Sequence, residues 1–307
     1  MSHIHRVLDK AQRDGFVKRT APVAPAERLV AGPPPQPLAA APPAIAPQAP
    51  PPAPSAVPNP VVAQVRTAES PALHPLLVAA LAPESNVAEQ YRSLRTRLAQ
   101  SENGRQYRAL IVTSPSAGDG KTLTALNLAL TMAQEFHKRV LVVDADLRKG
   151  CLHRLLNLPA SPGLCEVLTG EATLEEALVS LPDYHLTVLP AGGPTGQPAE
   201  MLGSAEMRRA LDLLRTQYDR ILLDTPPVLA LADVGVLAPM ADGVLMVVRA
   251  GRTSRPTIDR ALQEVHSTPV VGLVLNDVED LGPEYPDYPE VSAAARRLRF
   301  PARRRSA

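Results

Sequence analysis

Short apolar runs alternate with amphipathic stretches through most of the chain. The runs are ALIVTS, RVLVVDAD, HLTVLP, RILLDTPP, GVLMVVRA and VVGLVLND, and segments with helical periodicity separate them. Runs that are apolar on both faces are typical of parallel strands that are covered by helices on both sides. The pattern therefore predicts an α/β domain over residues 84–276, with a mainly parallel sheet and helices on both faces.

The N-terminal part of the chain has a different pattern. Apolar side chains recur at helical spacing in residues 1–18, which predicts a short amphipathic helix; they are Ile4, Val7, Leu8 and Ala11. Such a helix fits docking to a partner or to an anionic membrane surface, and it equally fits a marginal helix without function. Residues 19–83 are rich in proline and alanine, and 15 of the 34 prolines lie between residues 21 and 60. This composition predicts a disordered, extended linker.

Composition narrows the partners and the compartment. The 307 residues carry a formal net charge of +1, so no excess of basic charge indicates a nucleic-acid partner. The two cysteines, Cys151 and Cys165, lack metal-ligand spacing and fit reduced core thiols. The longest apolar candidate for a membrane span, residues 227–248, is interrupted by Asp233 and Asp242. We therefore expect a cytoplasmic protein.

The stretch SPSAGDGKT, residues 114–122, follows the run ALIVTS and opens a helical segment. A strand, a glycine turn and a helix are the setting in which a P-loop holds phosphate on backbone N–H groups. Gly118, Gly120, Lys121 and Thr122 match the second half of the pattern G-x-x-x-x-G-K-[ST], whereas Pro115 stands where its first glycine is expected. Alone, the stretch fits either a nucleotide site or a glycine-rich loop that caps an ordinary helix.

Carboxylates follow two of the predicted strands. Asp144 and Asp146 come after one strand, and Asp224 ends another. Any one of them could cap a helix, but ligands of parallel sheets bind at the carboxyl ends of strands. Mg²⁺ on a nucleotide is held by one or two carboxylates, phosphate oxygens and the hydroxyl of the P-loop, here Thr122. Together with the loop, these residues predict ATP and Mg²⁺ as cofactors.

Three motifs in this order, SAGDGKT, DADLR and ILLDTPP, resemble the bacterial tyrosine autokinases (BY-kinases) of capsule and exopolysaccharide synthesis. These are P-loop ATPases related to the ParA and MinD type, and the resemblance covers residues 84–276. In the family the loop usually has the sequence P-G-E-G-K-[ST], so a glycine in place of Pro115 is not expected, and Ala117 and Asp119 are mild departures. Ser116 stands where ParA and MinD relatives carry a lysine, which favours the kinase over a switch ATPase.

The resemblance implies transfer of the γ-phosphoryl group of ATP to a tyrosine. It implies Lys121, Asp144 and Asp146 as catalytic residues, with Asp144 accepting the tyrosine proton. The nucleotide-binding residues would be Gly118, Asp119, Gly120, Lys121, Thr122, Leu123, Arg148 and Asn276, with Asn276 in the adenine pocket. Mg²⁺ would be held by Thr122, Asp146 and Asp224. For Arg148, an ion pair with a nearby acid is an equal alternative to a phosphate contact.

The same resemblance implies phosphorylation in trans. The acceptors would be Tyr285 and Tyr288, in a flexible tail of residues 277–307 that ends in a basic stretch. Glu89, Arg92 and Arg95 match the E-x-x-R-x-x-R segment through which these kinases form rings, although their spacing alone fits a solvated helix face with ion pairs.

The implied partners are a membrane adaptor on a separate chain, which regulates polysaccharide chain length, further copies of this chain in a ring, and a cognate phosphatase. The kinase would then lie at the inner face of the plasma membrane through its adaptor. Two alternatives remain: a ParA or MinD type ATPase switch, and a non-catalytic scaffold gated by ATP.

Overall fold

The computed structural model of the chain describes residues 65–69, 71–102, 104–135 and 138–278. The predicted N-terminal helix, most of the predicted linker, and the tail with Tyr285 and Tyr288 lie outside these residues. Within them, no helix has the length and apolar character that crossing a membrane requires.

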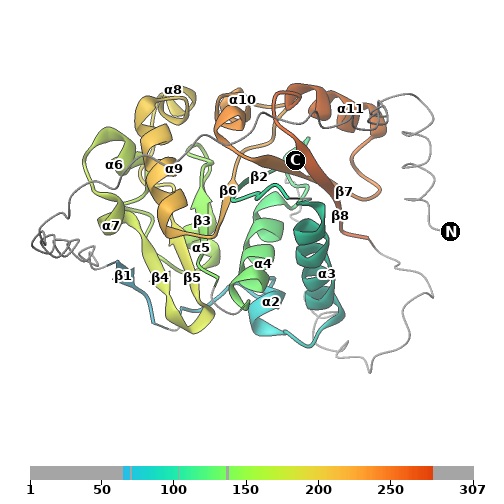
Figure 1. The fold of residues 1–307 in the computed structure, drawn as a ribbon, viewed down its shortest axis with the longest axis horizontal. Coiled ribbons are helices and arrows are strands. Elements are labelled where there is room, and N and C mark those ends of the chain that lie inside the picture. Colours follow the sequence, from blue (N-terminus) through green and yellow to red (C-terminus); the bar gives the residue numbers. More distant parts are fainter. Residues whose placement is uncertain (1–64, 70, 103, 136–137, 279–307) are drawn as a thin grey trace, which may run out of the picture. The chain divides into compact units, whose positions relative to one another are not determined.

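A single sheet runs through the domain, with the strand order β1-β4-β5-β3-β6-β2-β7-β8 (Figure 1). Every neighbouring pair is parallel except β4 and β5. The predicted α/β fold with a mainly parallel sheet is thereby confirmed. The strands are β1 (Arg66–Thr67), β2 (Ala109–Thr113), β3 (Val140–Asp144), β4 (Val179–Leu181), β5 (Leu186–Leu189), β6 (Arg220–Asp224), β7 (Gly243–Arg249) and β8 (Val270–Asn276).

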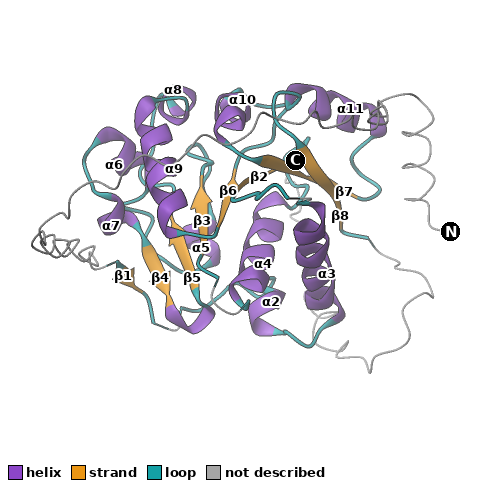
Figure 2. Cartoon of the chain, in the orientation of Figure 1, coloured by secondary structure: helices purple, strands orange, loops and turns teal. Residues whose placement is uncertain are grey.

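Helices cover both faces of this sheet (Figure 2). One face carries α2 (Val78–Leu81), α3 (Asn86–Ser101), α4 (Lys121–Ala133) and α5 (Leu152–Leu155). The other face carries α6 (Leu164–Thr169), α7 (Leu174–Ala177), α8 (Pro198–Leu202), α9 (Ala205–Gln217), α10 (Asp233–Leu237) and α11 (Arg255–Glu264). Two short 3₁₀ helices, η1 (Pro182–Tyr184) and η2 (Ala238–Met240), complete the described elements.

The two helical layers explain why the central strands are apolar at every position. Successive side chains of a strand point to opposite faces of the sheet. In β2, Ile111 therefore packs under the helices α6–α11, whereas Leu110 and Val112 pack under α2–α5. All five residues of β2 are buried, and so are all five of β3.

The folded domain begins earlier than the predicted boundary at residue 84. Strand β1 pairs with β4, and Leu77, directly before α2, is fully buried. The Asn127 side chain of α4 fixes this segment, because it accepts the Ala79 N–H at 3.0 Å and donates to the Leu76 carbonyl at 3.0 Å. The end of the predicted linker is therefore wrong. Strand β1 has two residues and helix α2 has four, so neither is long enough to show a periodicity in the sequence. The proline-rich composition around them predicted a linker instead.

Candidate active site

The P-loop joins the end of β2 to the start of α4. Gly118 and Gly120 both have positive φ, at 86° and 96°, a region that side chains other than glycine rarely adopt. A Cβ atom at Gly120 would also lie 2.0 Å from the Nδ2 atom of Asn276. The two glycines are therefore required by the backbone, and Gly120 also by the close approach of β8.

The predicted lysine, hydroxyl and carboxylates meet at one edge of the sheet. Strands β3 and β6 are neighbours, so Asp144 and Asp224 lie opposite each other in register. The Nζ atom of Lys121 lies 3.5 Å from Oδ2 of Asp146 and 3.8 Å from Oδ1 of Asp224. The Thr122 hydroxyl donates to Oδ2 of Asp224 at 2.7 Å. Four residues from three strand ends thus form one polar cluster.

Asp224 is the electrostatic centre of this cluster. It is fully buried, and burial raises the pKa of its carboxyl to about 6, although the Lys121 charge and the Thr122 hydrogen bond act in the opposite direction. Burial would lower the pKa of Lys121, but the charges of Asp224 and Asp146 outweigh burial and raise it. The lysine therefore keeps its positive charge, which a phosphate-binding group needs.

The residues present fit a magnesium ion. Oδ1 of Asp224 is buried and makes no hydrogen bond within the described part of the chain. A buried carboxylate oxygen without a donor is costly unless another group satisfies it. Mg²⁺ prefers oxygen ligands, typically one or two carboxylates together with substrate phosphate, and Thr122, Asp146 and Asp224 supply oxygens of that kind.

Asp144 has different surroundings from the other two carboxylates. It is fully buried, and its oxygens accept the backbone N–H groups of Asp146 at 3.3 Å and Leu152 at 3.0 Å. Burial and the nearby charge of Asp224 raise the pKa of its carboxyl to about 7. Gly150 packs so closely that a Cβ there would lie 2.9 Å from the carboxylate. The carboxylate of Asp144 is therefore enclosed on the side of residues 150–152.

Arg148 is exposed and forms an ion pair with a buried acid. Its Nε and Nη2 atoms donate to the two oxygens of Asp233, both at 3.1 Å, and Asp233 is fully buried. Of the two roles open from the sequence, the structure shows the pairing with a nearby acid. Asp233 lies 85 positions away, so sequence spacing gave no sign of it.

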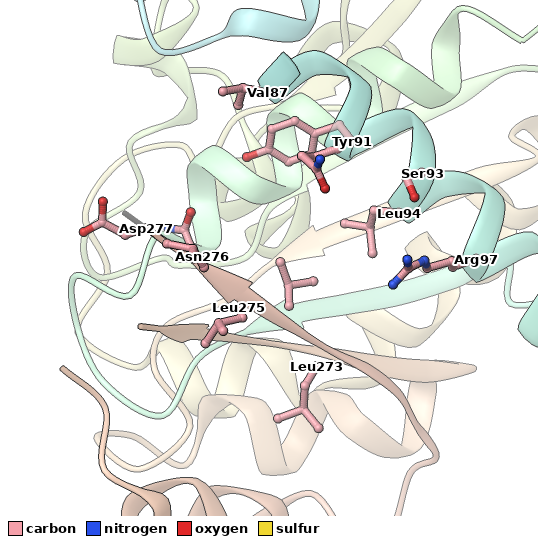
Figure 3. A pocket seen from close by; sticks show the side chains of 12 residues that line it. Val87, Tyr91, Ser93, Leu94, Arg97, Leu273, Leu275, Asn276 and Asp277 are labelled. Atoms are coloured by element: carbon pink, nitrogen blue, oxygen red, sulfur yellow. The ribbon is translucent and has the colours of Figure 1, made fainter. Parts of the chain in front are cut away.

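Asn276 lies between the P-loop and a groove. Its Nδ2 atom donates to the backbone carbonyl of Asp119 at 2.9 Å. On its other side, a groove of about 480 Å³ separates α3 from β8 (Figure 3). Tyr91 and Leu94 line the groove from α3, and Leu275 lines it from β8. The predicted adenine-pocket residue thus borders a partly apolar space beside the P-loop. Leu123 instead packs against the core.

The helix α3 carries the predicted ring-forming segment. Its N-cap is Ser85, whose side chain accepts the Ala88 N–H. Glu89 and Arg92 pair with each other at 2.7 Å. Arg95 turns to α4, where it donates to the Thr131 carbonyl at 2.9 Å and pairs with Glu135 at 3.1 Å. Glu89 and Arg92 thus pair with each other within α3, whereas Arg95 connects α3 to α4.

The two cysteines differ. Cys165 is buried, in line with a core thiol, whereas Cys151 is half-buried beside Gly150. Burial and the charge of Asp224 raise the pKa of the Cys151 thiol, so it stays protonated. Sequence patterns also gave no sign of two residues that contact the P-loop, Arg249 at the end of β7 and Thr253 in the segment after it. These contacts join residues more than 130 positions apart, which no local motif can indicate.

Comparison with known proteins agrees with this geometry. The family model described as an AAA domain matches residues 108–268. The tyrosine-protein kinase YwqD of Bacillus subtilis is 35% identical over 202 residues, which cover 65% of this chain and 85% of YwqD. The chain belongs to the bacterial tyrosine-protein kinases.

Longer relatives share the same domain with this tyrosine kinase. The putative tyrosine-protein kinase EpsB of Ralstonia nicotianae is 35% identical over 205 residues, which cover 66% of this chain but only 27% of EpsB. Among solved structures, the kinase domain of the Escherichia coli tyrosine kinase ETK superposes with a TM-score of 0.65 at 28% identity. That match covers 70% of this chain and 84% of the ETK domain. The chain thus spans most of YwqD and about a quarter of EpsB.

Proposed function

We propose that this kinase transfers the γ-phosphoryl group of MgATP to Tyr285 and Tyr288 in the tail of a neighbouring copy. The observation that carries the proposal is the meeting of Lys121, Thr122 and the two carboxylates at the ends of β2, β3 and β6. Phosphoryl transfer depends on positioning and on neutralising charge, which this cluster supplies.

Each residue of the cluster has a part in the reaction. Lys121 and the P-loop N–H groups hold the β- and γ-phosphates, and Thr122, Asp146 and Asp224 hold Mg²⁺, which neutralises phosphate charge when bound. The tyrosine oxygen forms a bond to the γ-phosphorus as the bond to the bridging oxygen breaks, and ADP leaves. Asp144 takes the phenolic proton, as the family resemblance implies. Its burial requires the segment 150–152 to open first.

The regulatory setting is also a proposal. Adding about 1.5 to 2 negative charges per tyrosine should repel the acidic tail from a carboxylate-rich site and loosen the assembly. A ring of copies would therefore assemble and come apart with phosphorylation, and a phosphatase would reset it. We further propose that a membrane adaptor on a separate chain holds the kinase at the inner face of the plasma membrane and couples it to polysaccharide chain length.

Mass spectrometry of the full chain incubated with ATP and Mg²⁺ tests the activity. We expect phosphate on Tyr285 or Tyr288, lost in the double variant Tyr285→Phe/Tyr288→Phe. Tyr184→Phe is the matched control, because Tyr184 lies in η1 within the folded domain, and it should keep the signal. ATP hydrolysis without phosphotyrosine would instead identify an ATPase switch, and ATP-dependent assembly with neither activity would identify a scaffold.

Mixing two inactive variants tests transfer in trans. Lys121→Met keeps the acceptor tyrosines, and Tyr285→Phe/Tyr288→Phe keeps the active site. Transfer between copies predicts that phosphate appears on the tail of Lys121→Met only when both variants are present. A mixture that stays unphosphorylated, beside a parent chain that is phosphorylated, would show transfer within one copy.

Separate substitutions test the α3 segment. Glu89→Ala/Arg92→Ala should shift the oligomer toward smaller species in analytical ultracentrifugation without lowering the unfolding temperature. Arg95→Ala should lower that temperature, because it removes the contacts with Thr131 and Glu135 on α4. An unchanged oligomer distribution in Glu89→Ala/Arg92→Ala would mark this surface as a solvated helix face.

A further inference from the structure

The segment between β7 and α11 contacts the P-loop, and so do the last residues of β7 and β8. Thr253 donates its hydroxyl hydrogen to Oδ1 of Asp119 at 2.9 Å. Arg249, the last residue of β7, donates to the Gly118 carbonyl at 3.4 Å. Asn276, the last residue of β8, donates to the Asp119 carbonyl at 2.9 Å. Three side chains from outside the motif thus hold two consecutive P-loop residues.

Asp119 is the centre of these contacts. Only 1% of it is exposed, and its second oxygen, Oδ2, accepts the Ser116 N–H at 2.9 Å. A carboxylate in a phosphate-binding loop would repel the nucleotide if its oxygens faced the phosphates. Here both oxygens have protein donors, one inside the loop and one on Thr253. The side chain of Asp119 therefore connects two points of the loop and joins the loop to the segment that contains Thr253.

Arg249 and Asn276 extend the attachment to the backbone. Arg249 is itself held by Asp277, which accepts from its Nε atom at 2.7 Å. The Ala250 N–H donates to the Asn276 carbonyl at 2.8 Å, so the two strand ends are joined. Carbonyl groups of Gly118 and Asp119 are engaged from outside. These two contacts engage carbonyl groups of the loop, so neither of them occupies an N–H group of the kind that binds phosphate.

We propose that Thr253, Arg249 and Asn276 form a clamp that holds the P-loop in its phosphate-binding shape, with Thr253 as a positioning residue for ATP. Preorganising a site raises affinity because the loop loses less conformational freedom when the ligand binds. The clamp should therefore act on ATP affinity more than on the rate of transfer. The inference rests only on the nucleotide-binding part of the proposed function, and it stands whether or not tyrosine is the acceptor.

Titration of the full chain with a fluorescent ATP analogue and Mg²⁺ tests the clamp. Thr253→Val removes the hydroxyl at nearly constant volume and should weaken nucleotide binding about fivefold, the effect of one net hydrogen bond. Thr253→Ser restores the hydroxyl and should bind within about twofold of the parent. Thr216→Val is the matched control, because the Thr216 hydroxyl donates to the Leu213 carbonyl on the exposed side of α9, and its nucleotide binding should not change.

A double-mutant cycle and hydrogen exchange separate positioning from general loss of structure. In an Asp119→Ala background, Thr253→Val should have no further effect on affinity, because the partner of the hydroxyl is gone. In the nucleotide-free protein, the P-loop amides of residues 118–120 should exchange faster in Thr253→Val than in the parent or in Thr216→Val. Hydrogen exchange still reports the order of the P-loop backbone if the nucleotide affinity of a variant is too low to measure.

Three results would overturn the clamp. They are parental affinity in Thr253→Val, affinity in Thr253→Ser as weak as in Thr253→Val, and additive effects of Thr253→Val and Asp119→Ala. Parental nucleotide binding by Thr253→Val combined with absent phosphotransfer in the parent would overturn both the clamp and the kinase activity. A fivefold loss of binding in a protein without phosphotransfer would overturn the kinase activity alone.

Discussion

The P-loop has two flanks with opposite character. On one flank stand the carboxylates of β3 and β6, where Asp224 is buried with an oxygen that makes no hydrogen bond in the described domain. On the other flank stands the clamp, where both oxygens of the buried carboxylate of Asp119 have donors. The buried carboxylate of the first flank thus has one oxygen without a hydrogen bond among the described residues, whereas the buried carboxylate of the second flank has a donor for each oxygen.

This difference indicates that one flank binds the ligand and that the other supports the P-loop. Buried charges without full partners are costly, and they persist where a ligand completes them. The carboxylate flank therefore has the properties of a site that binds a metal and phosphates. The clamp has the properties of a scaffold, because its members satisfy one another and need nothing from the ligand. Variants on the two flanks should accordingly fail in different ways.

The largest expected effect lies on the carboxylate flank. Lys121→Met removes the cation that lies within 3.8 Å of Asp146 and Asp224 and should lower phosphotransfer at least about 100-fold. Lys138→Met, on the exposed segment before β3, is the control and should leave the rate unchanged. Phosphotransfer is measured by phosphotyrosine formation under saturating ATP. A Lys121→Met variant that binds ATP and autophosphorylates like the parent would contradict the assignment of the P-loop.

A smaller effect tests the ion pair of Arg148. Arg148→Met leaves the buried carboxylate of Asp233 without its partner and should lower the free energy of unfolding. Arg209→Met removes an ion pair with Glu206 that is exposed on both sides and should lower the free energy of unfolding less than Arg148→Met does.

The variant Arg148→Met/Asp233→Asn should recover most of the lost stability, as measured by urea unfolding. An Arg148→Met variant with parental stability but little phosphotransfer would instead show that Arg148 contacts the phosphates.

How much the sequence predicts also differs between the flanks. The loop SAGDGKT and the carboxylates after β3 and β6 are local motifs, and parallel strand order brings their ends together, so the sequence predicts this flank well. The Thr253–Asp119 bond joins positions 134 apart, and the Arg148–Asp233 pair joins positions 85 apart. Neither contact leaves a periodicity or a motif in the sequence, because each forms only when the chain folds. The same holds for β1, which two residues form and which only its pairing with β4 defines.

The smallest effect compares the stability of the flanks directly, with the nucleotide and Mg²⁺ left out. Asp224→Asn removes a fully buried charge and should raise the unfolding temperature by about 3 °C. Thr253→Val takes one donor from the buried Asp119 and should lower the unfolding temperature by about 3 °C. Differential scanning calorimetry measures both, with Thr216→Val as the control without a shift. Shifts of the same sign would show that the two flanks do not differ in how well their buried carboxylates are hydrogen-bonded. Opposite shifts would show that, in the protein without nucleotide and Mg²⁺, the charge of Asp224 lowers the stability and the Thr253–Asp119 hydrogen bond raises it.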